Sequence, residues 1–451
     1  MSTEASPAQN AAPFFTSLRQ HLRAALAQLQ ALDAEALARA ATFLERSPRK
    51  IPMPAFLNGL LAIAPETRLT LQRVARAIGQ AAHTTYTKQA LHERLSGGLD
   101  AFLAHVITTW LGHLAQSLPT RPALAPFARV LVQDSTAQTL PKHLAALFPG
   151  AGNQHGSAQA TLKIQWIGDL KNSTVEHVSL SAFTHNDQAA APDILTVARA
   201  GDLVMRDLGY FVSEVLARLA TAGVFFLSRL RHDVNLYDPR TGQPLDLIAR
   251  LQQAGSLDQA VWVGPQRVPA RLVALPVPQE VANGRRHKAK TSARQRHRSP
   301  PGAAHLCLMS WNLFLTNVPA KIWSPKVVVA VYRLRWRIEI IIKTWKSHLG
   351  LRQLNCRTEG LLRLSLWTRL LFCALVGHLA DAVELHCPAG QHVSLLRLGH
   401  RLGQWASGFS ATVLGLSVER WIEASLAEEV FYERRRDRKN YYELFLKADP
   451  G

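Results

Sequence analysis

The chain has 451 residues, a length at which two or three domains are expected. Hydrophobic residues make up 47% of it, which is enough for a sizeable core and excludes a globally disordered protein. Lysine and arginine number 52 against 32 aspartate and glutamate residues. The resulting formal charge of +20 predicts a polyanionic partner, with nucleic acid first and an acidic membrane surface a distant second.

Sequence features related to targeting predict a cytoplasmic protein without a membrane partner. The N-terminal residues MSTEASPAQN have neither a basic region nor an apolar run, so no signal peptide is expected. The apolar stretch 371–380 lies next to Arg369 and contains His378, which favours a buried helix over a membrane span. The four cysteines have no CxxC spacing, so we expect free thiols in a reducing compartment.

Residues 14–118 have a helical pattern. Within them, two short amphipathic segments, 70–79 and 87–95, are joined by AAHTTY, and Thr87 is a candidate N-cap for the second. This arrangement resembles a helix-turn-helix, although an ordinary helical hairpin explains it equally well. In a helix-turn-helix the second segment would enter a major groove with its basic side chains, which are Lys88, His92 and Arg94.

From residue 129 the pattern becomes that of an α/β domain. The apolar β-run 130–132 ends in Asp134, and 160–183 contains two alternating strands around a turn at 168–173. The elements expected next are a short helix at 193–200, a β-run at 203–205 that ends at Asp207, a helix at 213–221 and a strand at 224–230. This order of strands and helices predicts an RNase H-like α/β core.

In such a core the aspartate that closes the first strand lies next to the aspartate that closes the fourth. A single aspartate at a strand end is usually a turn former or a cap. Asp134 and Asp207 each close an apolar β-run in a strongly basic chain, and this pairing favours a functional site.

The long interval after Asp207 predicts an inserted, β-rich subdomain. Its strands are expected at 234–237, 261–263, 267–277 and 306–316. Residues 283–301 are rich in arginine and lysine and contain no acidic residue. Such a run is often simply solvated. In a DNA-binding protein we expect it to form a basic loop that grips phosphates, with Arg285, Arg286, Lys288 and Lys290 as candidates.

Residues 332–346, YRLRWRIEIIIKTWK, have the pattern of an amphipathic helix with one buried face. Its polar side chains lie within an arc of roughly 80° and are Tyr332, Arg335, Glu339, Lys343 and Lys346. One interpretation is a solvated face with i, i+4 ion pairs. The other is a helix that presents a metal-binding carboxylate beside cations that hold a phosphate.

The spacing Tyr332, Arg335, Glu339 and Lys346 resembles the Y–R–E–K signature of insertion-sequence family four, a family of DDE-type bacterial transposases. The flanking RWRIE and KTWK are also similar to that family, and the motifs cover about residues 130–350. The chain departs from the pattern after Asp207, where Leu208 stands in place of an arginine that relatives often have.

The resemblance implies a D–D–E triad of Asp134, Asp207 and Glu339 that binds two Mg²⁺ or Mn²⁺ ions. It implies that phosphates of the processed strand are held by Tyr332, Arg335, Lys343 and Lys346, and that Trp311 of the insertion stacks on a displaced base. It further implies cut-and-paste transposition of double-stranded DNA by a homodimer that associates with the bacterial nucleoid. The alternatives are a DNA-binding regulator that no longer cleaves and a nuclease without strand transfer.

The expected organisation is an α/β protein of five segments. Residues 1–125 form a helical DNA-binding domain, and residues 126–232 form the first part of an RNase H-like catalytic core. Residues 233–318 form the β-rich insertion with its basic loop. Residues 319–360 complete the core with the Y–R–E–K helix, and 361–451 form a C-terminal helical region.

Overall fold

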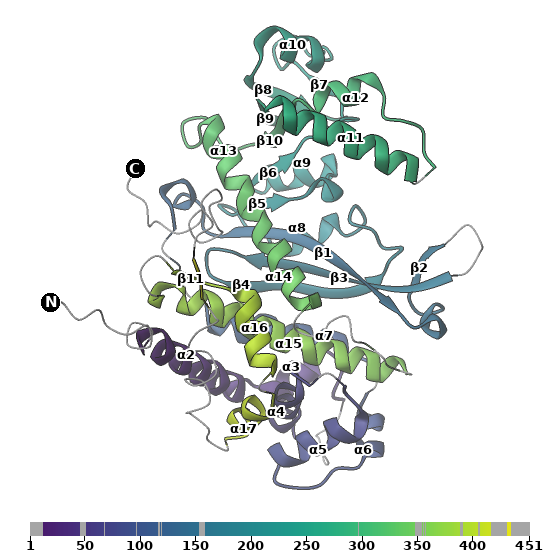
Figure 1. Ribbon diagram of the computed structural model, residues 1–451, viewed down its shortest axis with the longest axis vertical. Helices are drawn as coiled ribbons and strands as arrows, with labels where there is room; N and C mark the ends of the chain where they lie inside the picture. Colours follow the sequence, from purple (N-terminus) through teal and green to yellow (C-terminus); the bar gives the residue numbers. More distant parts are fainter. Residues whose placement is uncertain are drawn as a thin grey trace, which may run out of the picture. The chain divides into compact units, whose positions relative to one another are not determined.

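The computed structural model describes residues 12–415, apart from 46–50, 67, 96, 116–117, 119, 153–157, 296, 348–353, 355, 357, 388–390 and 405, together with 431–433 (Figure 1). The chain forms two compact units. The first comprises Met1–Leu118, Ser135–His185 and Trp336–Tyr442, and the second comprises Pro119–Asp134, Asn186–Arg335 and Glu443–Gly451. Strand β1 (Val130–Leu140) contributes residues to both units.

The first unit is mainly helical and is built around the long helix α15 (Glu359–Val383). In the described part of the chain, Glu359–His386 is the one helical stretch long and apolar enough to cross a membrane, but 78% of its apolar window is buried within the protein. The predicted buried helix is therefore confirmed. The helices that pack against α15 are α2 (Ala12–Ala31), α4 (Met53–Ile63), α7 (Leu99–His113) and α16 (Leu395–Gln404). The unit also contains α3 (Ala34–Ala40), α14 (Trp336–Ser347) and α17 (Ala406–Val413).

The two predicted short N-terminal helices are α5 (Leu71–Ala81) and α6 (Lys88–Arg94). Thr87 caps α6 as expected, because its hydroxyl oxygen accepts a hydrogen bond from the Ala90 amide at 3.1 Å. Gly79 is required where α5 ends, since a Cβ there would lie 2.6 Å from the carbonyl oxygen of Thr84. The connection between α5 and α6 is therefore tightly folded.

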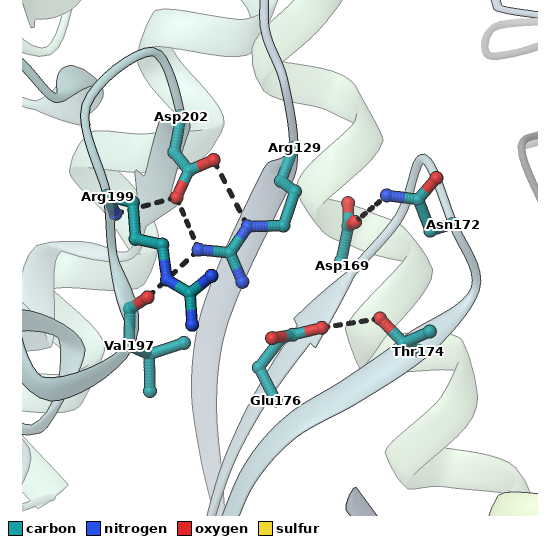
Figure 2. Close-up of polar contacts among 8 residues, drawn as sticks. All are labelled: Arg129, Asp169, Asn172, Thr174, Glu176, Val197, Arg199 and Asp202. Atoms are coloured by element: carbon teal, nitrogen blue, oxygen red, sulfur yellow. Dashed lines mark hydrogen bonds and ion pairs between the residues drawn. The ribbon is translucent and has the colours of Figure 1, made fainter. Parts of the chain in front are cut away.

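Three strands of the first unit form antiparallel pairs: β2 (Pro149–Gly152) with β3 (Ala158–Asp169), and β3 with β4 (Thr174–Ala182). The β3–β4 hairpin was predicted, whereas β2 was not. Asp169 fixes the turn by accepting a hydrogen bond from the Asn172 side chain at 2.5 Å (Figure 2). It also accepts one from the Lys171 amide at 2.9 Å. A small sheet pairs β11 (Gln391–Val393) with β12 (Phe431–Glu433).

The second unit contains a mixed sheet. Its strands, in spatial order, are β1, β5 (Leu203–Arg206), β6 (Phe225–Arg229), β10 (Trp311–Thr316), β9 (Val268–Pro276), β8 (Leu257–Val263) and β7 (Leu236–Tyr237). The first three strands are parallel to one another, and the others pair antiparallel. The helices of this unit are α8 (Ile194–Val197), α9 (Ser213–Thr221), α10 (Leu247–Ala254), α11 (Gln279–Gln295), α12 (Ala303–Leu308) and α13 (Pro325–Tyr332). The predicted α/β fold class is confirmed.

A bidentate ion pair joins the residues that immediately precede β1 and β5. Arg129 donates to both carboxylate oxygens of Asp202, at 3.1 and 2.6 Å, and also to the carbonyl of Val197 at 2.9 Å (Figure 2). The Arg199 amide donates to the same carboxylate at 2.8 Å. The register between the two parallel strands is thus set where the strands begin.

Three boundaries differ from the sequence expectations. β1 continues through Asp134 to Leu140, because the small polar residues after Asp134 alternate between buried and accessible positions as in any strand. Residues 283–295 of the segment expected to be a basic loop are helical as part of α11, which contains no proline. The strand expected from residue 306 begins only at Trp311, since α12 occupies the residues before it. The C-terminal segments 416–430 and 434–451, expected to be helical, lie outside the described residues.

Candidate active site

Two aspartates lie side by side on adjacent parallel strands of the second unit. Gln133 of β1 pairs with Arg206 of β5, so the residues that follow them, Asp134 and Asp207, are also neighbours. Asp207 has an extended backbone, with φ −77° and ψ 168°. Because side chains alternate between the faces of a sheet, both carboxylates point to one face, and Gln133 and Arg206 point to the other. The second unit therefore brings together the two aspartates that the sequence pairs.

Arg335 reaches one of these carboxylates. Its Nη1 lies 3.5 Å from Oδ2 of Asp134, and the two side chains are 7% and 18% exposed. A guanidinium at this distance offsets part of the negative charge of a carboxylate that water reaches only partly. Arg335 therefore lies beside the aspartate pair, and its role toward phosphate stays a prediction.

Tyr332 is buried beside the same group of residues. Its hydroxyl donates to the main-chain carbonyl of Arg206 at 3.5 Å, and its ring packs against Phe314 with the ring centroids 5.0 Å apart. Burial raises the pKa of Tyr332 to about 12, and the nearby Asp207 charge adds to this effect while Arg335 opposes it. Tyr332 is therefore a neutral hydrogen-bond donor across the physiological pH range.

The Y–R–E–K segment is not one continuous α-helix. α13 ends at Tyr332, and residues Arg333–Arg335 form a 3-10 turn, η5, before α14 begins. The Arg333 amide bonds to the carbonyl of Ala330, three residues back, and this tighter winding changes the rotation per residue. The expected single polar face is accordingly wrong, because Tyr332 and Arg335 are both buried.

α14 carries the rest of the signature in the first unit. Glu339 and Lys346 are half-buried, and Lys343 is exposed. The apolar side of the helix is fixed by Ile338 and by Trp345, whose ring packs edge-on against Trp166 at 4.6 Å. The burial of this side agrees with the pattern read from the sequence.

Arg337 is a buried cation that the sequence analysis did not single out. It forms an ion pair with Asp381 of α15, and the hydroxyl of Ser173 in the β3–β4 turn donates to the same carboxylate at 2.6 Å. Arg337 is 3% exposed and Asp381 is 8% exposed. This pair fastens α14 two residues before Glu339. No local signal marks it, because an arginine in an amphipathic helix ordinarily faces water.

The arginine and lysine residues of α11 divide into two groups. Arg285 donates to the Asn312 side chain at 2.7 Å and to the Trp311 carbonyl at 3.2 Å, and Arg286 donates to the Ser310 hydroxyl at 2.6 Å. These arginines hold the start of β10. The other group, which is exposed on α11, consists of Lys288, Lys290 and Arg294.

The remaining predicted DNA contacts have different surroundings. Trp311 is half-buried, and its indole N–H donates to the Gly255 carbonyl at 2.8 Å. On α6, Lys88 is exposed and Arg94 is half-buried. Their roles toward DNA stay predictions.

The aspartate pair suits a hard divalent cation. Two carboxylates on adjacent strands offer oxygen ligands, which Mg²⁺ and Mn²⁺ prefer. Within the described residues, no three histidine, cysteine, aspartate or glutamate side chains are already grouped closely enough to hold a metal ion. The fit therefore rests on the carboxylates of Asp134 and Asp207.

A family model described as a transposase DDE domain matches residues 125–376, which include both aspartates and the whole Y–R–E–K segment. The chain belongs to this family. The DDE transposase resemblance drawn from the signature is thereby confirmed. The match covers more than half of the chain, and it begins just before β1 and ends within α15.

Individual transposases are also similar to this DDE-domain chain. The transposase for insertion sequence element IS231F of Bacillus thuringiensis subsp. israelensis is 28% identical over 312 residues, covering 64% of each chain. The IS231B transposase of Bacillus thuringiensis subsp. berliner is 29% identical, covering 62% of each. The IS1151 transposase of Clostridium perfringens is 26% identical, covering 59% of this chain and 61% of its own. The chain thus spans a little under two thirds of the length of these relatives.

Proposed function

We propose that this DDE-domain protein is the transposase of an insertion sequence. It binds the terminal inverted repeats of its element and catalyses metal-dependent hydrolysis and strand transfer at the transposon ends. The observation that carries the proposal is the pairing of Gln133 with Arg206, which makes Asp134 and Asp207 neighbours, together with the contact of Arg335 with Asp134. Relatives that are named transposases of insertion sequences support it.

The catalytic roles follow from the chemistry of the side chains. Asp134, Asp207 and Glu339 are the carboxylates that hold the divalent ions. Glu339 is supported by its position in the chain, four residues after Arg335. Two bound Mg²⁺ or Mn²⁺ ions supply activation of the attacking water or 3′-hydroxyl and stabilisation of the leaving 3′-oxygen. The phosphate being processed is held by Arg335, Lys343 and Lys346. Tyr332, whose hydroxyl donates to the Arg206 carbonyl, supports this group from the end of α13.

DNA affinity comes mainly from cations outside the aspartate pair. Lys288 and Lys290 on α11 are exposed and contact phosphates, and Lys88 and Arg94 of α6 contribute from the N-terminal helices. Joining two transposon ends requires two active sites, so the protein acts as a homodimer on double-stranded DNA. The formal charge of +20 agrees with double-stranded DNA, a polyanion, as the partner.

The test is cleavage of a labelled duplex that carries the element's own terminal repeats, with and without Mg²⁺, for the wild type and Asp134→Asn. Nicking at the transposon end that requires Mg²⁺ and disappears in the variant is the expected result. Binding of the duplex should be nearly equal in both proteins. Tight binding without cleavage by the wild type in either Mg²⁺ or Mn²⁺ would instead indicate a regulator that shares the fold and no longer cleaves.

A further inference from the structure

A buried polar pair lies on the face of the sheet opposite the two aspartates. Gln133 is 1% exposed and Arg206 is 2% exposed, and they precede Asp134 and Asp207 by one residue each. Nη1 of Arg206 donates to Oε1 of Gln133 at 3.5 Å. The same register therefore places the Gln133 and Arg206 side chains on one face of the sheet and the two carboxylates on the opposite face.

The Gln133–Arg206 pair also holds the loop that precedes α8. Gln133 donates through Nε2 to the carbonyl of Ala190 at 2.9 Å, and Arg206 donates through Nη1 to the carbonyl of Ala191 at 3.0 Å. The main-chain carbonyl of Arg206 in turn accepts the hydrogen bond from Tyr332. Both strands are thus connected through the pair to one loop and to the tyrosine of the signature.

The guanidinium of Arg206 has no carboxylate partner among the described residues, and its Nη2 makes no hydrogen bond there. The side chain is 2% exposed, and a guanidinium keeps its proton in proteins, so a charge is buried at this position. A buried charge without an ion-pair partner is costly, and an apolar side chain of similar size would ordinarily be more stable at this position. The position is therefore not explained by stability alone.

We infer that Arg206 and Gln133 are positioning residues, which fix the separation and direction of the Asp134 and Asp207 carboxylates so that the pair binds divalent ions. The inference rests on the proposed function. Residues behind metal ligands commonly change metal affinity by 10- to 100-fold when they are replaced, because the ligands lose their fixed orientation. A loop tied to both strands prevents either strand end from shifting independently of the other.

The chain provides a matched control at the opposite end of the same two strands. Arg129 joins β1 to β5 through Asp202 and is likewise mostly buried, but it lies five residues before Asp134 (Figure 2). Arg129→Met therefore removes a buried cation that links the same strands without touching the residues adjacent to the carboxylates. It reports what loss of stability alone does to metal binding.

The experiment measures Mn²⁺ binding by the whole chain in two ways: the Mn²⁺-induced rise in melting temperature without DNA, and the Mn²⁺ concentration that gives half-maximal nicking of the terminal-repeat duplex. For Arg206→Met we expect the Mn²⁺ concentration at half-saturation to rise about tenfold or more. For Gln133→Leu the same concentration should rise by a smaller factor. Arg206→Lys should restore part of the affinity. Arg129→Met should melt at a lower temperature and keep the wild-type Mn²⁺ half-saturation.

Two outcomes overturn the inference. One is an Arg206→Met protein that remains folded and keeps the wild-type Mn²⁺ half-saturation, and the other is an Arg129→Met protein with the same rise as Arg206→Met. If Arg206→Met does not fold, Gln133→Leu decides in the same way. Asp134→Asn separates this inference from the proposed function, because an Mn²⁺ response that persists without that carboxylate means that the metal site itself was wrongly assigned.

Discussion

Arg337 of α14 forms a buried ion pair with Asp381 of α15, two residues before the glutamate of the signature. The contact crosses 44 residues of sequence and is completed by the Ser173 hydroxyl. α14 is therefore held in place by a polar contact as well as by its apolar side chains. The stability of the first unit and the placement of Glu339 depend on the same pair.

Removing one partner of this pair should destabilise the first unit strongly. Asp381→Asn leaves the Arg337 guanidinium buried without its counter-ion, so the free energy of unfolding should fall by about 3–5 kcal/mol. Arg337→Met should lower the free energy of unfolding by a similar amount. The double variant should lose less stability than the two single variants added together. Denaturant unfolding checks this. The exposed pair Arg73–Glu66 of the same unit is the control, and Glu66→Gln should cost at most about 1 kcal/mol.

Glu339→Gln should abolish cleavage of the terminal-repeat duplex and leave its binding nearly unchanged. The substitution preserves the shape of the side chain and removes the charge that would bind a divalent ion. Cleavage and gel-shift assays on the same duplex measure the two properties. A variant that lost binding in parallel with cleavage would argue against a role for Glu339 as a metal ligand.

Arg335→Ala should reduce cleavage more than it reduces DNA affinity. The side chain contacts Asp134 at 3.5 Å, so its loss removes a cation beside the aspartate pair. The expected loss of cleavage rate is about a hundredfold to a thousandfold, as for removal of one charge-stabilising donor. Arg333→Ala is the comparison, because Arg333 lies two residues away in the same 3-10 turn and is exposed. Equal rates for the two variants would exclude a special role for Arg335.

His378 should make the first unit sensitive to acid. Burial lowers the pKa of His378 to about 4; the neighbouring His21 lowers it further and Asp381 opposes the shift. The unfolded chain therefore binds a proton near pH 6.5 that the folded chain does not, and stability falls as the pH drops from about 6.5 toward 4. The total effect is at most about 3 kcal/mol. Unfolding of the wild type and His378→Gln at pH 7 and pH 5 measures it, and the variant should lose less stability on acidification.

The lysines of α11 should act on DNA affinity and the arginines on stability. Replacing Lys288 and Lys290 by alanine should weaken binding of any duplex and leave the melting temperature of the protein unchanged. The slope of the logarithm of the binding constant against the logarithm of salt concentration should become shallower by about one for each lysine removed. Arg285→Ala should lower the melting temperature, because it leaves the Asn312 side chain and the Trp311 carbonyl without their donor. Binding isotherms at several salt concentrations together with thermal unfolding separate the two effects. Unchanged binding by the double lysine variant would remove α11 from the DNA interface.

The parallel core was predictable because its strands are short apolar runs. The β-runs before Asp134 and Asp207 and the helix Ser213–Thr221 follow directly from hydrophobic periodicity. The place where β1 ends was not predictable. Thr136 and Gln138 are buried in the second half of β1, and small polar residues carry no local signal of such burial.

Buried cations were the features that the sequence could not reveal. Arg206, Arg335 and Arg337 are all inside the protein, although arginine is usually exposed. Spacing identified Arg335 through the signature, but its burial depends on the 3-10 turn, which no proline or glycine marks. Arg206 contacts Gln133, 73 residues away, and Arg337 contacts Asp381, 44 residues away, so only the fold shows these partners.

The helical state of α11 has a consequence for the thermodynamics of binding. A flexible basic loop would have to become ordered on the DNA, and each residue ordered would cost roughly 1–2 kcal/mol of conformational entropy. In α11 the backbone of Lys288, Lys290 and Arg294 is already ordered before any nucleic acid arrives. Association of this segment should therefore be accompanied by little folding and a small change in heat capacity, and the release of counterions should dominate its entropy.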